Sequence, residues 1–201
     1  IVDCSAIPMP ANVTAADNCD ASLTVNYVQN RTNGNCPNNY TLTRTWTVTD
    51  VCGNTQTATQ ILTVQDTIKP VITVTPKDTI IECNGLGNTA DIQNWLNNNG
   101  AGRATDNCGV ITWTHNYTSL TTTTCGTVGN ATVIFTATDD CGNFTTATAT
   151  LTIRDTQKPV ITGVPNDTTV SCSAVPVAAN PSVSDVCDAT IALVYNETRT
   201  N

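Results

Sequence analysis

The sequence predicts an all-β fold made of repeated, disulfide-rich modules, and three observations support this prediction. The chain has 201 residues, of which 10 are cysteines, and Thr and Asn are abundant where an α-helical protein would use Glu, Lys and Leu. Apolar residues alternate with Thr over short stretches, which is the period of a half-buried strand. Cys19 and Cys52 recur 89 positions later as Cys108 and Cys141, and a fixed period indicates a repeated module.

The repeat divides the chain into three predicted modules. The first covers residues 1–65 and lacks the start of the repeat, the second covers 66–154 and is complete, and the third covers part of a repeat at 155–201. Each later module begins with the string Asp-Thr-x-Lys-Pro, whose proline fixes φ and keeps the preceding residue extended. Short, stiff joints of this kind predict a rod-like array rather than modules on flexible linkers.

Each module is predicted to contain several short antiparallel strands. Leu42, Trp46 and Val48 occupy one face of such a strand, with Thr residues between them. The expected strands lie at 40–49 and 131–137, at 58–64 and 147–153, and at 23–27, 111–113 and 191–195. Turn-forming Asn, Asp, Gly and Pro separate these stretches, a pattern typical of immunoglobulin-like β-sandwiches of about 100 residues. We therefore expect tandem immunoglobulin-like β-sandwich repeats, stapled by disulfides.

An insertion near residues 88–100 distinguishes the second module and predicts a short helix. Ile92, Trp95 and Leu96 stand at positions i, i+3 and i+4, and Gly100 provides a stop signal. We expect Trp95 to cover one edge of the sandwich, and contact with a ligand is the alternative.

The four cysteines of a module allow three pairings, and strand direction favours one of them. The strand between Cys36 and Cys52 would separate its ends by roughly 30 Å, whereas bridged Cα atoms lie within about 7 Å. If successive cysteines lie at alternate ends of a sandwich, the first pairs with the third and the second with the fourth. The favoured bridges are Cys4–Cys36, Cys19–Cys52, Cys83–Cys125 and Cys108–Cys141, with the partners of Cys172 and Cys187 beyond residue 201. The alternative pairs neighbours in sequence, namely Cys4–Cys19 and Cys36–Cys52, and permits a Cys172–Cys187 bridge.

Acidic and amide side chains gather in the recurring turns and predict a cation site at the junction of two modules. The candidate ligands in the second module are Asp66, Asp106, Asn107, Asp139 and Asn143. Ca²⁺ prefers six to eight oxygen ligands from carboxylates, amides and carbonyls, which such a junction supplies. The alternative is that these residues only form Asx-turns, which need no metal.

Composition and charge exclude several classes of function. The net charge is −8 and the few Lys and Arg residues form no cluster, so the surface would repel nucleic-acid phosphates. His115 is the only histidine, so the chain lacks the residues for a histidine-based catalytic triad or a metal site with several histidines. No stretch of about 18 apolar residues predicts a membrane span. We therefore expect neither an enzyme, nor a nucleic-acid-binding protein, nor a membrane-spanning segment.

Three strings of the sequence resemble a known family. They are Asp-Asn-Cys at 17–19, Thr-Arg-Thr-Trp-Thr-Val-Thr-Asp-x-Cys-Gly-Asn at 43–54, and Asp-Thr-x-Lys-Pro-Val-Ile at 66–72. They resemble HYR-like (hyalin repeat) immunoglobulin-like modules, in the cysteine-rich form found in large Bacteroidetes surface adhesins of the SprB-like gliding and adhesion type. In ordinary hyalin repeats the positions of Cys19 and Cys52 are commonly not cysteine, which fits a bridge between these two residues.

The resemblance implies a structural or adhesive stalk segment of a long, extracellular, bacterial cell-surface protein used in attachment or surface motility. The expected partners are further copies of the repeat in the same polypeptide, surface polysaccharide or other cells, and homotypic contacts in a fibre. Two alternatives are spacer modules of a secreted enzyme or carbohydrate-binding protein, and a subunit of a self-assembling extracellular fibre. None of these functions requires a cofactor, and Ca²⁺ is the one candidate ion.

Overall fold

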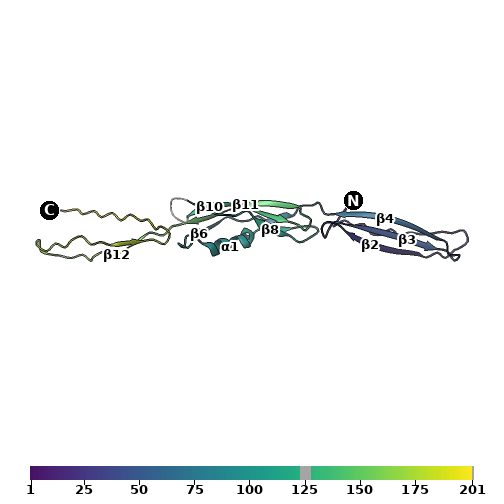
Figure 1. The fold of residues 1–201 in the computed structure, drawn as a ribbon, viewed down its shortest axis with the longest axis horizontal. Helices are drawn as coiled ribbons and strands as arrows, with labels where there is room; N and C mark the ends of the chain where they lie inside the picture. Colours follow the sequence, from purple (N-terminus) through teal and green to yellow (C-terminus); the bar gives the residue numbers. More distant parts are fainter. Residues whose placement is uncertain (123–127, 201) are drawn as a thin grey trace. The chain divides into compact units, whose positions relative to one another are not determined.

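The structure, a computed structural model, describes residues 1–122 and 128–200, and most of its regular structure is β (Figure 1). The strands are β1 (Val2–Asp3), β2 (Val25–Asn33), β3 (Tyr40–Thr49), β4 (Thr55–Gln65), β5 (Val71–Val74), β6 (Thr79–Glu82), β7 (Arg103–Thr105), β8 (Thr112–His115), β9 (Thr121–Thr122), β10 (Gly129–Thr138), β11 (Phe144–Arg154), β12 (Val160–Thr162) and β13 (Ser182–Ser184). The helical elements are α1 (Thr89–Asn97) and the 3-10 helix η1 (Asn99–Ala101). The predicted all-β fold is confirmed. Within the described ranges, no helix is both long and apolar enough to cross a membrane.

Near the N-terminus, four strands form one sheet in the order β1-β4-β3-β2. The central strand β3 has the bounds that the Thr alternation predicts, and it pairs antiparallel with both neighbours, so that Trp46 lies between Tyr27 and Ala58. β1 extends the sheet in the parallel sense, with Val2 opposite Val64. The buried cluster of this sheet consists of Leu42, Leu62 and Val64.

Arg44 also lies on the inward face of β3, which the apolar alternation alone does not predict. The residue is only 2% exposed. Its Nη2 donates to the carbonyl oxygen of Pro8 at 2.6 Å and its Nε donates to Oε1 of Gln29 at 3.0 Å. Because these acceptors replace water, the guanidinium group is buried without losing its hydrogen bonds. The segment around Pro8 therefore lies over this face of the sheet.

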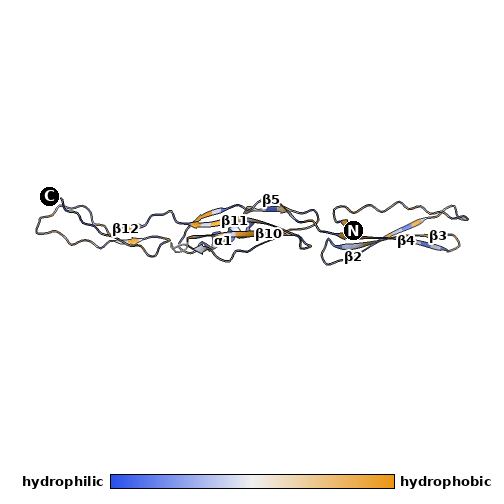
Figure 2. Cartoon of the chain, turned by 90° about the horizontal axis from the view of Figure 1, so that it is seen from above, coloured by the Kyte–Doolittle hydropathy of each residue, from blue (hydrophilic) through white to orange (hydrophobic). Residues whose placement is uncertain are grey.

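A second large sheet has the order β6-β11-β10-β8, and β9 pairs with β10. β6 pairs parallel to β11 with Ile81 opposite Ile153, just as Val2 faces Val64 in the first sheet. Ile81 and Val2 each stand two residues before a cysteine, so the two sheets share this register. Figure 2 shows the hydrophobic character of β10. The buried residues of β10 and β11 are Val133, Phe135, Ala137, Ala149, Leu151 and Ile153.

Two small sheets of two strands each complete the fold, namely β5–β7 and β12–β13. Val71 lies opposite Thr105 in the first pair, and Val160 lies opposite Ser184 in the second. Thr105 and Ser184 each directly precede an Asp-x-Cys turn, so these pairs again occupy matching positions in the sequence.

The strand predicted at 191–195 is absent, so this prediction is wrong. Leu193 and Tyr195 are exposed, and residues 189–200 have no strand pairing. The matching segment near the N-terminus is held in β2 by its hairpin partner β3. The described residues after 188 contain no such partner, and apolar alternation without a neighbouring strand does not form a sheet.

The chain forms two compact units, each made of segments that are not contiguous in sequence. One unit comprises Ile1–Thr75, Gly102–Thr114 and Phe135–Ala147, and the other comprises Pro76–Ala101, His115–Ile134 and Thr148–Asn201. β10 and β11 contribute residues to both units. The units cross the module boundaries predicted at 66 and 155, and those boundaries and the rod-like array stay predictions.

The helix α1 appears where the insertion pattern predicts it, with Ile92 and Leu96 buried. It begins after Asn88, which is 1% exposed and has a left-handed φ of 52°. The amide nitrogen Nδ2 of Asn88 donates to the carbonyl oxygen of Glu82 at 2.9 Å and to Oδ2 of Asp91 at 3.1 Å. Asn is one of the few residues that tolerate this φ, so Asn88 meets both a backbone and a hydrogen-bond requirement.

Replacing Asn88 by Ala is expected to lower the free energy of unfolding by about 2 kcal/mol, because buried groups lose their partners and Ala disfavours a positive φ. A urea titration followed by circular dichroism measures the change. Asn94→Ala, on the exposed face of the same helix, is the matched control and should stay within about 0.5 kcal/mol of wild type. Equal effects of the two substitutions would contradict this role of Asn88.

Candidate functional site: a carboxylate cluster beside two disulfides

Two disulfides lie in the unit that contains the N-terminus. They join Cys4 to Cys108 and Cys36 to Cys141, with Cα–Cα distances of 6.0 and 5.2 Å. The bridged residues are 104 and 105 positions apart, which is longer than the repeat period of 89. Each bridge therefore connects one copy of the repeat pattern to the next.

The pairings predicted within single modules are not those of the structure. The structure contradicts Cys4–Cys36 and Cys108–Cys141 because each of these cysteines has another partner. A third bridge joins Cys83 to Cys187, so the predicted Cys83–Cys125 pair and the external partner of Cys187 are also wrong; Cys125 itself lies outside the described residues. Among the described cysteines, Cys19, Cys52 and Cys172 are free and exposed, so Cys19–Cys52 is not formed.

The correction has a simple physical reason. The residue pairs Val2–Val64 and Tyr40–Val64 place Cys4 and the turn containing Cys36 at the same end of the first sheet, as strand direction predicts. Two further cysteines reach this end from the following copy, and they form the bridges. The predicted placement of the cysteines at this end was correct, but the argument considered only partners within one module.

Three carboxylates lie together beside these disulfides. Asp66 follows β4, Asp106 follows β7 and Asp139 follows β10, and one oxygen atom of each lies within 4.8 Å of the others. Asp66 is 3% exposed and Asp139 is 6% exposed. The sequence analysis proposed all three as cation ligands, and the structure brings them together.

One oxygen of each carboxylate accepts hydrogen bonds from its own turn. Oδ1 of Asp139 accepts the backbone N–H groups of Cys141 and Asn143 at 2.8 and 2.9 Å. Oδ1 of Asp106 accepts the N–H of Cys108 at 2.9 Å, and Oδ1 of Asp66 accepts the N–H of Ile68 at 3.2 Å. The Asx-turn interpretation is therefore correct for these oxygens, and it leaves the second oxygen of each group for other contacts.

The second oxygens of Asp66 and Asp106 are buried and have no hydrogen-bond partner. Burial raises the pKa of Asp66, and the nearby charges of Asp106, Asp139 and Asp3 raise it further. Converging, desolvated oxygens without donors are an unfavourable arrangement unless a cation or a proton balances their charge. Carboxylate oxygens are the ligands that Ca²⁺ prefers, so this donor set fits Ca²⁺.

The two predicted amide ligands have other roles. Nδ2 of Asn143 donates to Oδ2 of Asp139 at 2.8 Å and to the backbone oxygen of Asp66 at 3.2 Å, so its donor group orders the cluster. Nδ2 of Asn107 donates to Oδ1 of Asp3 at 3.0 Å, away from the three carboxylates.

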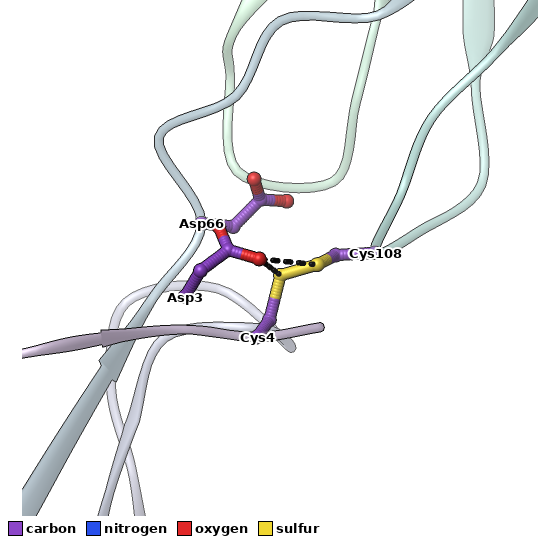
Figure 3. A group of neighbouring side chains, drawn as sticks. All are labelled: Asp3, Cys4, Asp66 and Cys108. Atoms are coloured by element: carbon purple, nitrogen blue, oxygen red, sulfur yellow. Dashed lines mark hydrogen bonds between the residues drawn. A yellow bond between two sulfur atoms is a disulfide. The ribbon is translucent and has the colours of Figure 1, made fainter. Parts of the chain in front are cut away.

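Asp3 is the acidic residue that the sequence analysis missed. Its Oδ1 lies 3.8 and 3.9 Å from the sulfur atoms of Cys4 and Cys108, and Asp66 lies beside this group (Figure 3). The hydroxyl and N–H groups of Ser5 are the main cause of a lowered pKa at Asp3. Its position directly before a repeated cysteine, which Glu82 shares before Cys83, was the available signal.

The N-terminal sheet and its four cysteines are similar to a known type of domain. Residues 1–64 match the family model described as an HYR-like domain with 4 cysteines. Residues 1–64 are similar to HYR-like domains. The match confirms the resemblance stated for these residues. No curated protein matches the chain.

The HYR-like domain and the three disulfides indicate an extracellular module, because such bridges persist in oxidising compartments. HYR-like domains are a structural and adhesion family rather than an enzyme family. In the matched segment, Cys4 and Cys36 are bridged to residues outside it, whereas Cys19 and Cys52 are free.

A related acidic group occurs in the second compact unit. Oxygens of Asp155 and Asp185 and the sulfur of Cys187 lie within 4.8 Å of one another. These residues stand where Asp66, Asp106 and Cys108 stand in the earlier repeat. The local arrangement therefore recurs, with its disulfide, at matching sequence positions.

Proposed function

We propose that the chain is a load-bearing segment of a long extracellular stalk, in which HYR-like repeats are joined in series by disulfides and by calcium. Such a stalk would belong to a bacterial cell surface and serve attachment or surface motility. The observation that supports this proposal most directly is the span of the bridges. A disulfide inside a module only stabilises that module, whereas bridges over 104 and 105 residues tie consecutive copies of the repeat to one another.

The carboxylate cluster supports the calcium part of the proposal. Asp66 comes from the joint between two predicted modules, while Asp106 and Asp139 come from turns of the following repeat. A cation bound by Asp66, Asp106 and Asp139 would fix the joint to those turns and balance charges that otherwise repel. The ion would supply structural cross-linking and no chemistry of its own.

Stretching the 201-residue chain by its ends tests the load-bearing role. In the oxidised chain, the shortest covalent route between the ends passes through Cys4, Cys108, Cys83 and Cys187 and bypasses most of the backbone. Single-molecule pulling should therefore give a total extension less than half of that after reduction. Equal extensions with and without reductant would contradict the proposal that disulfides join the repeats in series.

A cell-surface assay tests the adhesive part separately. The oxidised chain, immobilised on beads, should retain bacteria or surface polysaccharide more than beads carrying an unrelated disulfide-rich β-protein of similar charge. If both bead types retain equal amounts, the chain contributes length and strength to the stalk but no adhesive surface.

A further inference from the structure

A groove lies between the edge strand β6 and the helix α1, which belongs to an insertion of the second repeat. Cys83 and Cys108 are 25 positions apart, whereas the matching cysteines Cys4 and Cys19 of the first repeat are 15 apart. The groove has a volume of about 490 Å³, which is in the size range of small-ligand sites. All the residues that line it belong to one compact unit.

Two hydrogen bonds fix α1 alongside β6 (Figure 1). At the start of the helix, Nδ2 of Asn88 donates to the carbonyl oxygen of Glu82 at 2.9 Å. Farther along the helix, Nε1 of Trp95 donates to the carbonyl oxygen of Lys77 at 3.1 Å. Glu82 ends β6 and Lys77 precedes it, so the helix runs opposite to the strand and the two bonds cross the gap near both ends of β6.

One face of α1 borders the groove with a tryptophan and polar groups. Asp91, Trp95 and Asn98 stand at positions i, i+4 and i+7, which lie on one side of a helix. Trp95 is half-buried, and its bond to the Lys77 carbonyl holds the indole ring in one orientation. Oδ2 of Asp91 accepts the amide of Asn88 at 3.1 Å, which leaves Oδ1 for other contacts.

The strand side of the groove adds backbone groups. β6 pairs with β11 and is the last strand of its sheet. The N–H of Cys83 donates to Arg154 of β11, and successive strand residues direct their backbone groups to opposite edges, so those of Ile80 and Glu82 are directed away from β11. The carbonyl of Glu82 is used by Asn88. Ile80 therefore offers one donor and one acceptor at the edge that borders the groove.

The groove is also acidic. Glu82 and Asp91 both line it, and among the described residues no Lys or Arg does. Oε2 of Glu82 lies 3.9 Å from Nε of Arg154, and Oε1 accepts the N–H of Thr156 at 2.6 Å, so Glu82 is partly compensated. Asp91 is exposed and has no such cation beside it. A carboxylate next to an indole ring favours a ligand with a positive charge.

We infer that this groove binds an amino sugar with a free amine, as one residue of a polysaccharide. The indole ring of Trp95 packs against the C–H face of the sugar ring, and the carboxylate of Asp91 accepts hydrogen bonds from its ammonium group. The Asn98 amide and the Ile80 backbone bind its hydroxyl groups. Because side chains cross between α1 and β6 near both ends, the groove fits one ring better than an extended peptide along β6. The inference deepens the adhesive part of the proposed function, on which it rests, by naming the sugar and its site.

Isothermal titration calorimetry of the oxidised 201-residue chain tests this inference, with a glucosamine tetrasaccharide as the probe. We expect the N-acetylated tetrasaccharide to bind about tenfold more weakly, because acetylation removes the positive charge. Binding of the free-amine probe should also weaken as salt is added, since the charges meet at an exposed site.

Variants locate the binding in the groove. Trp95→Ala and Asp91→Asn should each weaken binding of the glucosamine tetrasaccharide by about tenfold. Asp167→Asn is the matched control, because it makes the same charge change at an exposed residue outside the groove, and it should keep the wild-type affinity. If circular dichroism shows that Trp95→Ala does not fold, Asp91→Asn still decides the question, because Asn keeps the shape of the side chain and removes its charge.

Four results would overturn the inference. They are no binding of the glucosamine tetrasaccharide, equal affinity for its N-acetylated form, wild-type affinity in Asp91→Asn, and equally tight binding of a lysine tetrapeptide, which would show recognition of charge alone. None of these results affects the pulling experiment, because that experiment depends on the disulfides. If beads carrying Asp91→Asn retain as much polysaccharide as wild-type beads, the adhesive surface lies outside the groove while the proposed function stands.

Discussion

Replacing Cys36 and Cys141 together by Ser is expected to lower the free energy of unfolding by about 4 kcal/mol. The bridge closes a loop of 105 residues, and in the chain-entropy account long loops restrict the unfolded chain most. The intact Cys4–Cys108 bridge shortens the loop that the second bridge closes, but the dependence on length is logarithmic, so most of the effect remains. Guanidinium unfolding followed by tryptophan fluorescence measures the change, since Trp46 is buried in the first sheet.

Cys52→Ser is the control for this pair of substitutions. It makes the same chemical change at a free, exposed cysteine, so its effect should stay within about 0.5 kcal/mol. If the double substitution costs no more than this control, the bridge between Cys36 and Cys141 does not form in solution.

Calcium is expected to raise the melting temperature, and Asp66→Asn is expected to remove this response. At a free concentration of one hundred times its dissociation constant, a ligand of the folded state stabilises it by about 2.7 kcal/mol. Asp66 has a buried, unpartnered oxygen in the cluster, and its replacement by an amide removes one negative ligand. In the presence of a chelator, the difference in melting temperature between wild type and Asp66→Asn should disappear or reverse. The variant should then be at least as stable as wild type, because two carboxylates repel less than three.

Differential scanning calorimetry measures the melting temperatures of wild type and Asp66→Asn, each in calcium and in chelator. Asp167→Asn is the matched control, because it makes the same charge change at an exposed carboxylate outside the cluster, and it should keep the full calcium response. A calcium response that is equal in wild type and Asp66→Asn would exclude the cluster as the binding site, and no response in wild type would remove calcium from the proposed function.

Much of the fold follows from local patterns in the sequence. The alternation of apolar residues with Thr gave the bounds of β3, and the i, i+3, i+4 pattern gave α1 with Ile92 and Leu96 inward. These features depend on residues a few positions apart, for which strand and helix periods are reliable guides. The grouping of Asp66, Asp106 and Asp139 was also predictable, because all three belong to recurring motifs, whereas their binding of a cation stays a prediction.

The features that escaped prediction depend on contacts across long separations. The partner of Cys36 is 105 residues away, and no pattern within one module identifies it. In the sequence, Arg44 interrupts an apolar face of β3. The structure explains its burial, because the carbonyl oxygen of Pro8 accepts a hydrogen bond from its guanidinium group. The alternation at 191–195 met every local criterion for a strand, yet it has no pairing partner among the described residues. Local patterns specify which face a residue prefers, and only the tertiary structure specifies what covers that face.

The overlap of the bridges along the sequence affects how the chain withstands proteases. Cys4–Cys108, Cys36–Cys141 and Cys83–Cys187 each begin before the previous bridge has ended. One backbone cleavage anywhere between Cys4 and Cys187 therefore leaves two fragments that are still joined covalently, and between Cys36 and Cys141 at least two bridges join them. A single cut at an exposed loop between Cys4 and Cys187 would therefore not divide the molecule into separate pieces.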